Sequence, residues 1–423
     1  MKVEKVMERV YDPRRLQEAW RQVKRNAGAA GIDEMTVDKF LTRGSELGPL
    51  ISRGLKEGTY RFKPAKRVYI PKPGTAKMRP LGIPVVMDRI VSQSIHLALE
   101  EIFEPEFTES NFGFRRGKSQ HMALEHVREI VREGHDWCVA VDLKSFFDEI
   151  PHGLILKLLR RKITDERLIT LVARALKAGV IVDGRFEKTE KGCPQGSPLS
   201  PLLSNIVLNE LDHELERRGL KYARWADDFI ILVKSERAAL RVLSGVTEYL
   251  EGNLRLPVNR EKSQAAKVRN VTFLGFQISK QGKVSISGKA GKQFREKVKA
   301  LTKRNNPCSM RRIVTELNLF LRGWVNYFKI QEDRHIFDEL DRFIRKRLRS
   351  MQLKKWKKPA KFQRVMIKAG FDPEEAKRTH IRMKSWSSVD RWPVKYTLNL
   401  NWFKEIGLIF LNDFVQSPQK PVS

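Results

Sequence analysis

Two acidic motifs stand out in a strongly basic chain. Asp142 ends the apolar run 137–142 (WCVAVD), and Asp227 and Asp228 closely follow the run 222–225. The chain as a whole has 82 Lys and Arg against 50 Asp and Glu, which gives a formal net charge of +32. Carboxylates at strand ends in such a chain favour a site that holds divalent metal beside a polyanion. The chemistry that this combination predicts is nucleotidyl transfer on nucleic acid.

Two-metal phosphoryl transfer needs two cations roughly 3.5–4 Å apart, one at the attacking 3′-oxygen and one at the leaving pyrophosphate. Magnesium prefers one or two carboxylates together with phosphate oxygens of the substrate. Taken singly, each motif has an ordinary alternative, a helix cap at Asp142 and a simple turn at Asp227 and Asp228. Their presence together in a basic chain favours the metal site.

Short strands and helices must position these carboxylates. The runs 222–225 and 229–233 predict a β-hairpin with residues 226–228 at its turn. Residues 137–142 predict a buried strand, and residues 67–84 predict a second hairpin with a basic tip. Apolar spacing predicts helices over 88–101, 117–133, 153–162, 166–178 and 202–217.

Length and composition bound the remaining classes. At 423 residues the chain is too long for one compact core, so two or three domains are expected. Positive charge spread along the chain favours an extended nucleic-acid surface, the plain alternative being a basic or ribosome-associated protein. Cys138, Cys193 and Cys308 form no CxxC pair, which argues against a zinc ribbon or a disulfide framework and fits a reducing compartment. The charged N-terminus and the lack of a long apolar run predict no signal peptide and no membrane partner.

Several strings occur in one order along the chain. They are 28–33 (GAAGID), 70–73 (IPKP), 79–84 (RPLGIP), 112–117 (FGFRRG), 192–205 (GCPQGSPLSPLLSN), 259–263 (NREKS), 273–276 (FLGF) and 323–328 (GWVNYF). With these strings the chain resembles the group II intron reverse transcriptase/maturases of the bacterial type. The resemblance covers most of the chain, from the N-terminal region to beyond Trp356.

The resemblance implies a fold and a domain plan. The fold is α+β, a right-hand polymerase with fingers, a palm built on an antiparallel sheet and a helical thumb, plus a small basic C-terminal region. The expected domains are an N-terminal extension (1–60), reverse transcriptase fingers and palm (61–288), a maturase/thumb (X) domain (289–356) and a DNA-binding region (357–423). Residues 289–360 fit a nucleic-acid-binding thumb, because they hold 21 Lys and Arg against 7 Asp and Glu in a helical pattern.

The resemblance also implies roles for residues at the reaction centre. Asp142, Asp227 and Asp228 are expected to bind two Mg²⁺, with Mn²⁺ as a substitute. The backbone at Leu143 is expected to touch the metal or the triphosphate. Lys262 is expected near the pyrophosphate as a proton donor, its plain alternative being a surface lysine.

A nucleotide pocket is implied around the same centre. Lys72 and Arg79 are expected to grip the triphosphate, although both suit a solvated hairpin. Phe147 is expected under the sugar 2′ position, where a hydroxyl would clash with its ring, and Gln195 and Gly196 are expected to line the pocket. The residues expected along the template and primer are Phe114, Arg115, Arg116, Trp225, Phe273, Leu274, Gly275 and Phe276.

The chain departs from the family pattern in two places. Trp225 stands where the family usually has Tyr, which keeps an aromatic face but removes a hydroxyl. Activity is expected to survive this change because the carboxylates remain. No Cys/His cluster follows Trp356, so no zinc endonuclease domain is expected, and there is no room for an RNase H domain.

The expected function is RNA-directed DNA polymerisation, with a maturase role in group II intron splicing and retrohoming. The expected partners are group II intron RNA or another RNA template, a DNA primer or target, and dNTP, in a bacterial cytoplasm with association to the nucleoid during work on DNA. Two alternatives stay open, a domesticated reverse transcriptase of DNA repair or defence and an RNA-binding maturase without polymerase activity. Whether the chain is a monomer or a dimer also stays open.

Overall fold

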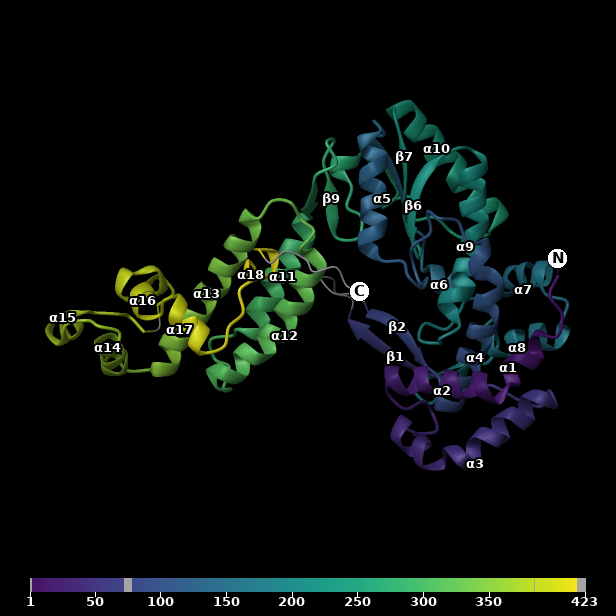
Figure 1. The fold of residues 1–423 in the computed structure, drawn as a ribbon, viewed down its shortest axis with the longest axis horizontal. Helices are drawn as coiled ribbons and strands as arrows, with labels where there is room; N and C mark the ends of the chain where they lie inside the picture. Colours follow the sequence, from purple (N-terminus) through teal and green to yellow (C-terminus); the bar gives the residue numbers. More distant parts are fainter. Residues whose placement is uncertain (1, 72–77, 384, 417–423) are drawn as a thin grey trace. The chain divides into compact units, whose positions relative to one another are not determined.

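The computed structural model describes residues 2–71, 78–383 and 385–416. The chain divides into two compact units (Figure 1). The first unit is Met1–Leu274 with Lys280–Gly282, and the second is Gly275–Ser279 with Lys283–Ser423. Within the described ranges, none of the helices has the length and apolar character needed to cross a membrane.

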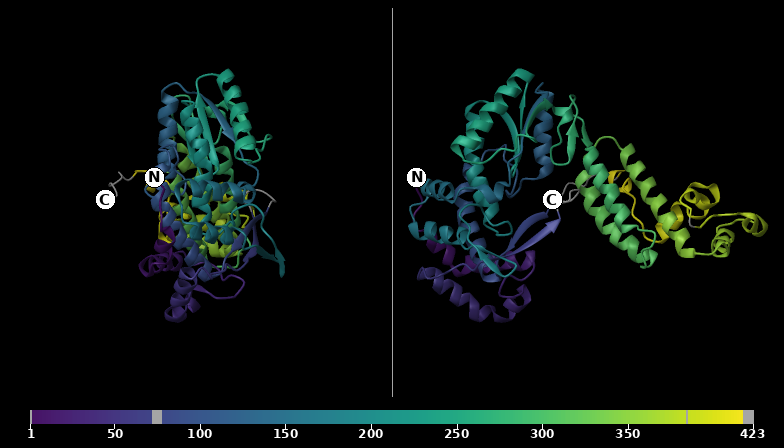
Figure 2. Two further views of the ribbon diagram at one scale, coloured as in Figure 1. Left: turned by 90° about the vertical axis from the view of Figure 1, so that its right-hand side faces the viewer. Right: turned by 180° about the vertical axis from the view of Figure 1, so that it is seen from behind.

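A four-stranded antiparallel sheet forms the centre of the first unit (Figure 2). Its strand order is β6 (Lys221–Trp225), β7 (Asp228–Val233), β3 (Trp137–Val141) and β8 (Gln264–Lys267). The central strands β7 and β3 consist largely of buried apolar residues, which is why they read as continuous hydrophobic runs. Helix α10 (Glu236–Glu248) packs on β3, β7 and β8, and α5 (Gln120–Arg132) packs on β6. This is the palm sheet that the sequence predicts.

The hairpin between β6 and β7 is tighter than the sequence suggested. Trp225 pairs with Asp228, so the turn consists of Ala226 and Asp227 alone, and Asp228 is the first residue of β7. Ala226 adopts a left-handed conformation with φ 58°. A two-residue hairpin loop demands such a φ because its twist must match that of the two strands. The expected three-residue turn is therefore wrong by one residue.

A second sheet belongs to the fingers part of the first unit. Its order is β2 (Met78–Ile83), β1 (Ala65–Pro71), β4 (Val180–Val182) and β5 (Arg185–Glu187), with β1 and β4 parallel and the other pairs antiparallel. The expected hairpin over 67–84 is thus present as β1 and β2. Its tip, which includes Lys72, lies outside the described residues.

Helices complete the first unit. They are α1 (Val6–Tyr11), α2 (Pro13–Asn26), α3 (Val37–Lys56), α4 (Val86–Phe103), α6 (Phe146–Glu149), α7 (His152–Lys162), α8 (Glu166–Leu176) and α9 (Ser200–Arg217). Helix α4 is buried over most of its surface, since it packs against α1, α2, α3 and α9. Asp12 separates α1 from α2, and its carboxylate accepts hydrogen bonds from the Arg14 and Arg15 backbone N–H groups.

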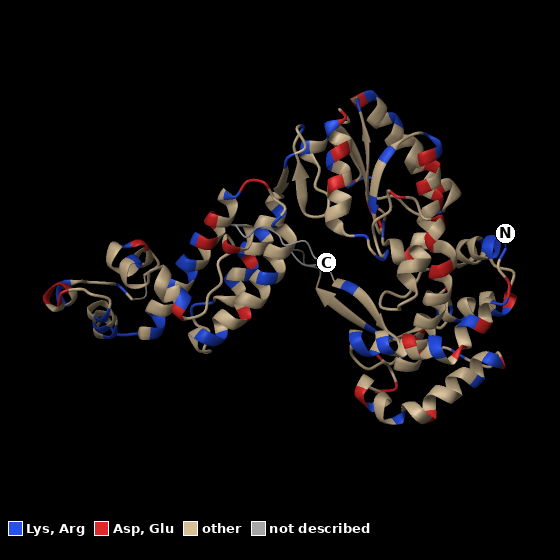
Figure 3. Cartoon of the chain, viewed as in Figure 1, with Lys and Arg blue, Asp and Glu red and all other residues tan. Residues whose placement is uncertain are grey.

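The second unit begins with a two-stranded sheet of β9 (Phe276–Ile278) and β10 (Val284–Ile286). Three helices follow, α11 (Gly288–Leu301), α12 (Met310–Phe328) and α13 (His335–Trp356). They share one hydrophobic core, and basic residues recur along the outside of α13 (Figure 3). The sequence predicts this helical, basic segment correctly.

The last part of the second unit differs from a simple C-terminal appendage. Helices α14 (Pro359–Lys368), α15 (Pro373–Arg378) and α16 (Trp392–Thr397) form a small core of their own with Leu353 and Trp356. The chain then returns through α17 (Leu400–Glu405) to α18 (Asp413–Gln416), and Phe403, Leu408 and Leu411 enter the core of α11–α13. Residues before and after position 356 therefore share hydrophobic cores.

Candidate active site

A cavity of about 1290 Å³ opens at one end of the palm sheet within the first unit. It is lined by the ends of β3 and β7, by β2, by the loop 27–29 and by residues 195–201 before and at the start of α9. The expected site residues that line it are Arg79, Phe114, Asp142, Leu143, Phe147, Gln195, Gly196, Trp225, Asp227, Asp228 and Lys262. Residues distant in the sequence thus meet around the carboxylates.

Asp142 is held at the end of β3 by the 259–263 segment. The Asn259 side-chain amide donates to Asp142 Oδ2 at 3.0 Å, and the Asn259 backbone N–H donates to the Asp142 carbonyl at 2.7 Å. The Asp142 backbone N–H donates to Ser263 Oγ at 3.1 Å, and Lys262 Nζ lies 3.3 Å from Asp142 Oδ2. Two of these contacts therefore reach the carboxylate and two hold the Asp142 backbone, and the Lys262 ammonium stands directly beside the carboxylate.

Asp228 lies where the antiparallel register of β7 and β3 places it, one step beyond the pair of Phe229 with Val141. Burial by the surrounding protein, together with the charges of Asp227 and Asp142, raises the pKa of Asp228 to about 7, although the residue still meets the solvent of the cavity. The Leu274 backbone N–H donates to its carboxylate and opposes this rise. A cavity that crowds carboxylates in this way has a strong preference for bound cations.

The turn that carries Asp227 rests on a buried ion pair. Arg224 and Asp212 are both fully buried, and Arg224 Nε lies 2.8 Å from Asp212 Oδ1. Arg224 Nη1 also donates to Asn205 Oδ1 at 2.9 Å and to the Ala226 carbonyl at 3.0 Å. The guanidinium thus ties the turn to α9. From the other side, Gly113 approaches so closely that a Cβ would stand 2.2 Å from the Ala226 nitrogen.

The oxygen ligands offered by Asp142, Asp227 and Asp228 fit Mg²⁺. Among residues 2–71, 78–383 and 385–416, no group of three or more His, Cys, Asp or Glu residues is placed so that it could hold a metal ion by itself. Mg²⁺ in proteins takes one or two carboxylates and completes its shell with water and substrate phosphate oxygens.

The nucleotide side of the cavity is formed by close backbone contact. The Gly82 backbone N–H donates to the Gln195 carbonyl at 2.7 Å. Gly196 has φ +117°, and a Cβ there would lie 2.2 Å from the Gly82 oxygen, so only glycine fits. Phe146 and Phe147 both line the cavity, but Phe146 is buried, as expected, whereas Phe147 is half-buried. Arg79 is exposed at the cavity wall.

Of the residues expected along the template, the structure separates Arg115 from its neighbours. The Arg115 side chain is only 5% exposed, and it donates to Glu104 Oε1 at 2.8 Å and to the carbonyls of Thr108 and Asn111. Arg115 therefore braces its own loop, between the exposed side chains of Phe114 and Arg116. Phe114 is exposed and lines the cavity, and Arg116 is exposed beside Glu100.

The 273–276 string is divided between the two units. In the first unit, Phe273 is buried and Leu274, with φ 51°, presents its backbone N–H to Asp228. In the second unit, Phe276 is fully buried against Phe328, with ring centroids 4.9 Å apart. The two phenylalanines therefore anchor the string by packing, and its backbone is the part that reaches the site.

Two positioning residues escape recognition by residue type alone. Asn259 belongs to a recognised string, but its hold on Asp142 depends on a strand pairing that brings residues 117 positions apart together. Arg89 is buried on α4, donates to the Pro84 carbonyl at 2.9 Å, and also donates to the carbonyls of Ala27 and Ala29. It thereby fixes the 27–29 loop at the edge of the cavity.

Replacing Asn259 with alanine should lower the rate of nucleotidyl transfer by roughly 10–100-fold, which is typical for loss of a group that orients a metal ligand. The reason is that Asp142 Oδ2 loses its 3.0 Å amide donor. The check is steady-state primer extension over a range of Mg²⁺ concentrations, where the Asn259→Ala variant should need more Mg²⁺. The exposed Asn270 provides a matched control, and equal rates for Asn259→Ala and Asn270→Ala would contradict the assigned role.

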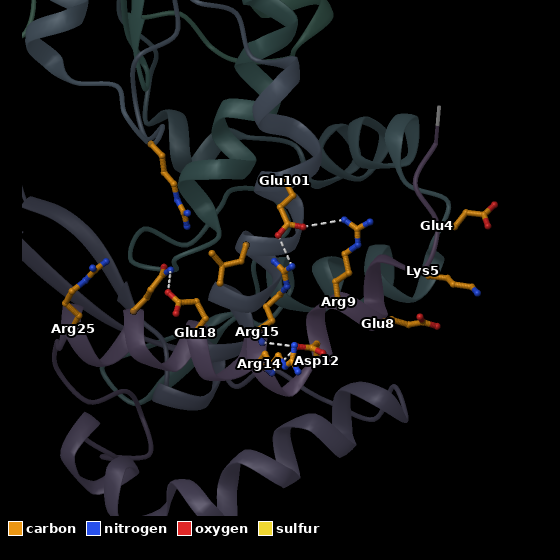
Figure 4. A pocket seen from close by; sticks show the side chains of 13 residues that line it. Glu4, Lys5, Glu8, Arg9, Asp12, Arg14, Arg15, Glu18, Arg25 and Glu101 are labelled. Carbon is orange, nitrogen blue, oxygen red and sulfur yellow. Dashed lines mark hydrogen bonds and ion pairs between the residues drawn. The ribbon is translucent and has the colours of Figure 1, made fainter. Parts of the chain in front are cut away.

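A second cavity, of about 1050 Å³, lies along α1, α2 and α4 (Figure 4). Arg9 and Arg15 both reach Glu101, with N–O separations of 3.4 Å and 2.8 Å. Its basic side chains alternate with acidic ones, so opposite charges largely cancel within it. It contains none of the expected catalytic residues, whereas Asp142, Asp227, Asp228 and Lys262 all line the cavity at the palm sheet.

Comparison with known proteins agrees with this geometry. Residues 70–278 match the reverse transcriptase (RNA-dependent DNA polymerase) family, and residues 291–369 match the group II intron maturase-specific domain. Protein YkfC of Escherichia coli is 33% identical over 319 residues, covering 66% of this chain and 84% of YkfC. Group II intron-encoded protein LtrA of Lactococcus lactis is 36% identical over 268 residues, covering 59% of this chain but only 44% of LtrA.

Among solved structures, telomerase from Candida albicans in complex with a fragment of telomeric RNA aligns with a TM-score of 0.43 and 10% identity, over 82% of this chain and 69% of that one. The two domain matches follow each other in the order of the sequence motifs, and the resemblance stated from those motifs is confirmed. The chain belongs to the group II intron-like reverse transcriptase/maturase family and is an RNA-directed DNA polymerase.

Proposed function

We propose that the palm cavity extends a DNA primer along an RNA template with two Mg²⁺ held by Asp142, Asp227 and Asp228, Mn²⁺ being a substitute. The observation that carries this proposal is the convergence of these carboxylates, from adjacent strands, in a cavity that also contains Arg79, Gln195 and Lys262. When bound, the cations would activate the primer 3′-oxygen and offset the charge on the leaving pyrophosphate.

The protein's own groups have distinct tasks in this proposal. Asn259 and Ser263 orient Asp142, while Arg224 and the Leu274 backbone orient the Asp227–Asp228 turn. Arg79, with Lys72, binds the triphosphate, and Lys262 stands ready to donate a proton to the departing pyrophosphate. The Leu143 backbone, Gln195 and Gly196 shape the nucleotide site. Phe114, Arg116 and Trp225 contact template and primer, and Arg115 braces the loop that presents Phe114 and Arg116.

The proposal extends to RNA splicing through the second unit. Residues 291–369 match the maturase-specific domain, and the basic helices α11–α13 suit recognition of an RNA backbone by shape and phosphate contacts. We assign residues 1–60 to an N-terminal extension, 61–288 to fingers and palm, 289–356 to the thumb and the residues after 356 to DNA contact, within a bacterial cytoplasm. Since the chain spans less than half of LtrA, intron splicing and retrohoming belong to this proposal.

Sugar discrimination gives a test of the nucleotide site. Replacing Phe147 with alanine should raise ribonucleotide incorporation relative to deoxynucleotide incorporation by roughly tenfold or more, because an aromatic wall under the sugar is removed. The check is extension of a DNA primer on an RNA template with each dNTP or its matching NTP. Phe146→Leu is the control, since Phe146 is buried beside it and should alter stability more than selectivity. An unchanged ratio in Phe147→Ala would remove Phe147 from the nucleotide site.

A further inference from the structure

Three aromatic rings form a surface on the small core at the end of the second unit. Trp392 and Tyr396 lie four residues apart on α16 with 61% and 46% of their surface exposed, and Phe371 lies beneath them, 7% exposed. The ring centroids of Trp392 and Tyr396 are 5.4 Å apart, and each lies within 5.3 Å of the Phe371 centroid. We call these three residues the α16 platform.

The platform is held in place from the inside. Val394 and Thr397 of α16 are buried, and Val394 belongs to the small core with Phe371. The inner face of α16 therefore fixes the direction of its outer face, so that Trp392 and Tyr396 point outward on a rigid support. Isolated exposed apolar residues are ordinary, but two fixed, adjoining aromatic rings on one helix face are a binding feature.

Two basic residues neighbour the platform in the sequence. Arg391 precedes α16 and Lys395 lies on it, and both are exposed. The Arg391 guanidinium also donates to the His380 carbonyl. Lys395 Nζ lies 3.9 Å from Asp390 Oδ1, a surface contact that binds neither group firmly. The segment 371–396, which includes all three platform residues, contains six Lys and Arg and four acidic residues, Asp372, Glu374, Glu375 and Asp390. Asp390 is already paired with Lys346 and Lys395. The remaining excess of positive charge favours a partner that carries negative charge next to flat, stackable rings.

Trp386, which precedes α16 in the sequence, is a tryptophan whose ring is already covered by cations. Lys346 Nζ and Arg347 Cζ lie 5.7 Å and 5.4 Å from the centroid of its ring. These cations already use the electron-rich face of Trp386, which is 38% exposed. Trp392 contacts Phe371 and Tyr396 and keeps far more of its surface free.

We propose that the α16 platform binds single-stranded DNA by stacking unpaired bases on Trp392 and Tyr396, while Arg391 and Lys395 contact the flanking phosphates. The choice of DNA rests on the proposed function, which assigns the residues after 356 to DNA contact. Unpaired bases are the feature recognised, because the bases of a duplex are stacked on each other and cannot cover a protein ring. The surface thus distinguishes single strands, such as a displaced or nicked target strand, from duplex.

The test is fluorescence anisotropy with the full chain and a labelled oligo-dT, run beside a duplex containing the same strand. The Trp392→Ala/Tyr396→Ala variant should bind oligo-dT more weakly by roughly 30-fold or more, since it loses the stacking of two bases. Its duplex affinity should fall by far less, and the salt dependence of binding should not change, because no charge is lost. The single variant Trp392→Phe keeps a ring and should recover most of the binding.

Leu400→Ala is the matched control, because Leu400 is an exposed apolar residue, at 52%, outside the platform. Equal loss of duplex and single-strand binding, no loss of oligo-dT binding, or a larger loss for oligo-rU than for oligo-dT would each overturn the proposal. Primer extension by the parent protein is measured on the same preparation. If the parent extends primers and the platform variant binds oligo-dT normally, the platform proposal alone is refuted. If the parent extends no primer and the platform variant loses oligo-dT binding, the polymerase proposal alone is refuted.

Discussion

Replacing Asp228 with asparagine is expected to reduce primer extension by roughly a thousandfold or more. The variant loses a ligand of the metal that stabilises charge in the transition state, and this loss raises the activation free energy by several kcal/mol. The side chain keeps its shape but loses the negative charge that holds a divalent cation. The measurement is single-turnover extension of a DNA primer on an RNA template in saturating Mg²⁺. Residual activity within tenfold of the parent would show that Asp228 is not a metal ligand.

The same substitution should not harm the fold, and its effect on stability depends on pH. The pKa of Asp228 is raised from 3.8 to about 7, so the folded state favours its protonated form. The destabilisation caused by its charge is absent below about pH 4, grows as pH rises, and is complete above about pH 7. Without metal at pH 8, Asp228→Asn should therefore be as stable as the parent or slightly more stable, by less than about 1 kcal/mol because cavity solvent screens the charge.

Thermal unfolding with and without Mg²⁺ separates this explanation from simple damage. Mg²⁺ binds the folded parent and should raise its Tm, whereas Asp228→Asn should show a smaller rise. Between pH 5 and pH 7.5 without Mg²⁺, the stability of the variant relative to the parent should increase. A variant that is less stable than the parent at every pH would mean that the Asp228 carboxylate mainly supports the fold.

The largest effect on stability is expected at Arg224. Arg224→Met leaves the Asp212 carboxylate buried without its partner, and breaking a buried ion pair in this way costs about 3–5 kcal/mol. The measurement is the free energy of unfolding from a denaturant titration. The control is Arg217→Met, because Arg217 is 70% exposed and its pair with Glu214 should contribute less than about 1 kcal/mol. Equal losses in the two variants would contradict the buried-pair argument.

Arg224 should also matter for catalysis, through the turn that it supports. Its guanidinium donates to the Ala226 carbonyl at 3.0 Å, one residue before Asp227. The double substitution Arg224→Met/Asp212→Leu removes both charges together and should recover stability relative to Arg224→Met. It should still extend primers more slowly than the parent, because the turn has lost its tie to α9. Full recovery of activity in the double variant would show that the tie does not position Asp227.

The sequence predicts those parts of the site that depend on patterns among neighbouring residues. The β6–β7 hairpin and the buried strand before Asp142 follow from alternation and apolar runs. The order of the motif strings along the chain indicates the protein family. Local patterns also explain the small error at the turn, since a two-residue loop and a three-residue loop look alike until the register is known.

The parts that the sequence does not reveal depend on which distant residue each side chain meets. An arginine in the 112–117 string has the same type whether it meets a template or a carboxylate, and Arg115 meets Glu104. Arg224 and Asp212 become a buried pair only when β6 packs beside α9. The return of Phe403 and Leu411 to the core of α11–α13 is likewise a tertiary event.

The most direct test of the central claim is extension of a DNA primer on an RNA template by the parent protein, with dNTPs and Mg²⁺, beside the Asp227→Ala/Asp228→Ala variant. The account predicts template-directed DNA synthesis by the parent, its loss when Mg²⁺ is chelated, and none above background by the variant. A folded parent that binds RNA but extends no primer would contradict the account and would favour an RNA-binding maturase. The first substitution to make in that case is Trp225→Tyr, which introduces the residue that the family usually has at this position.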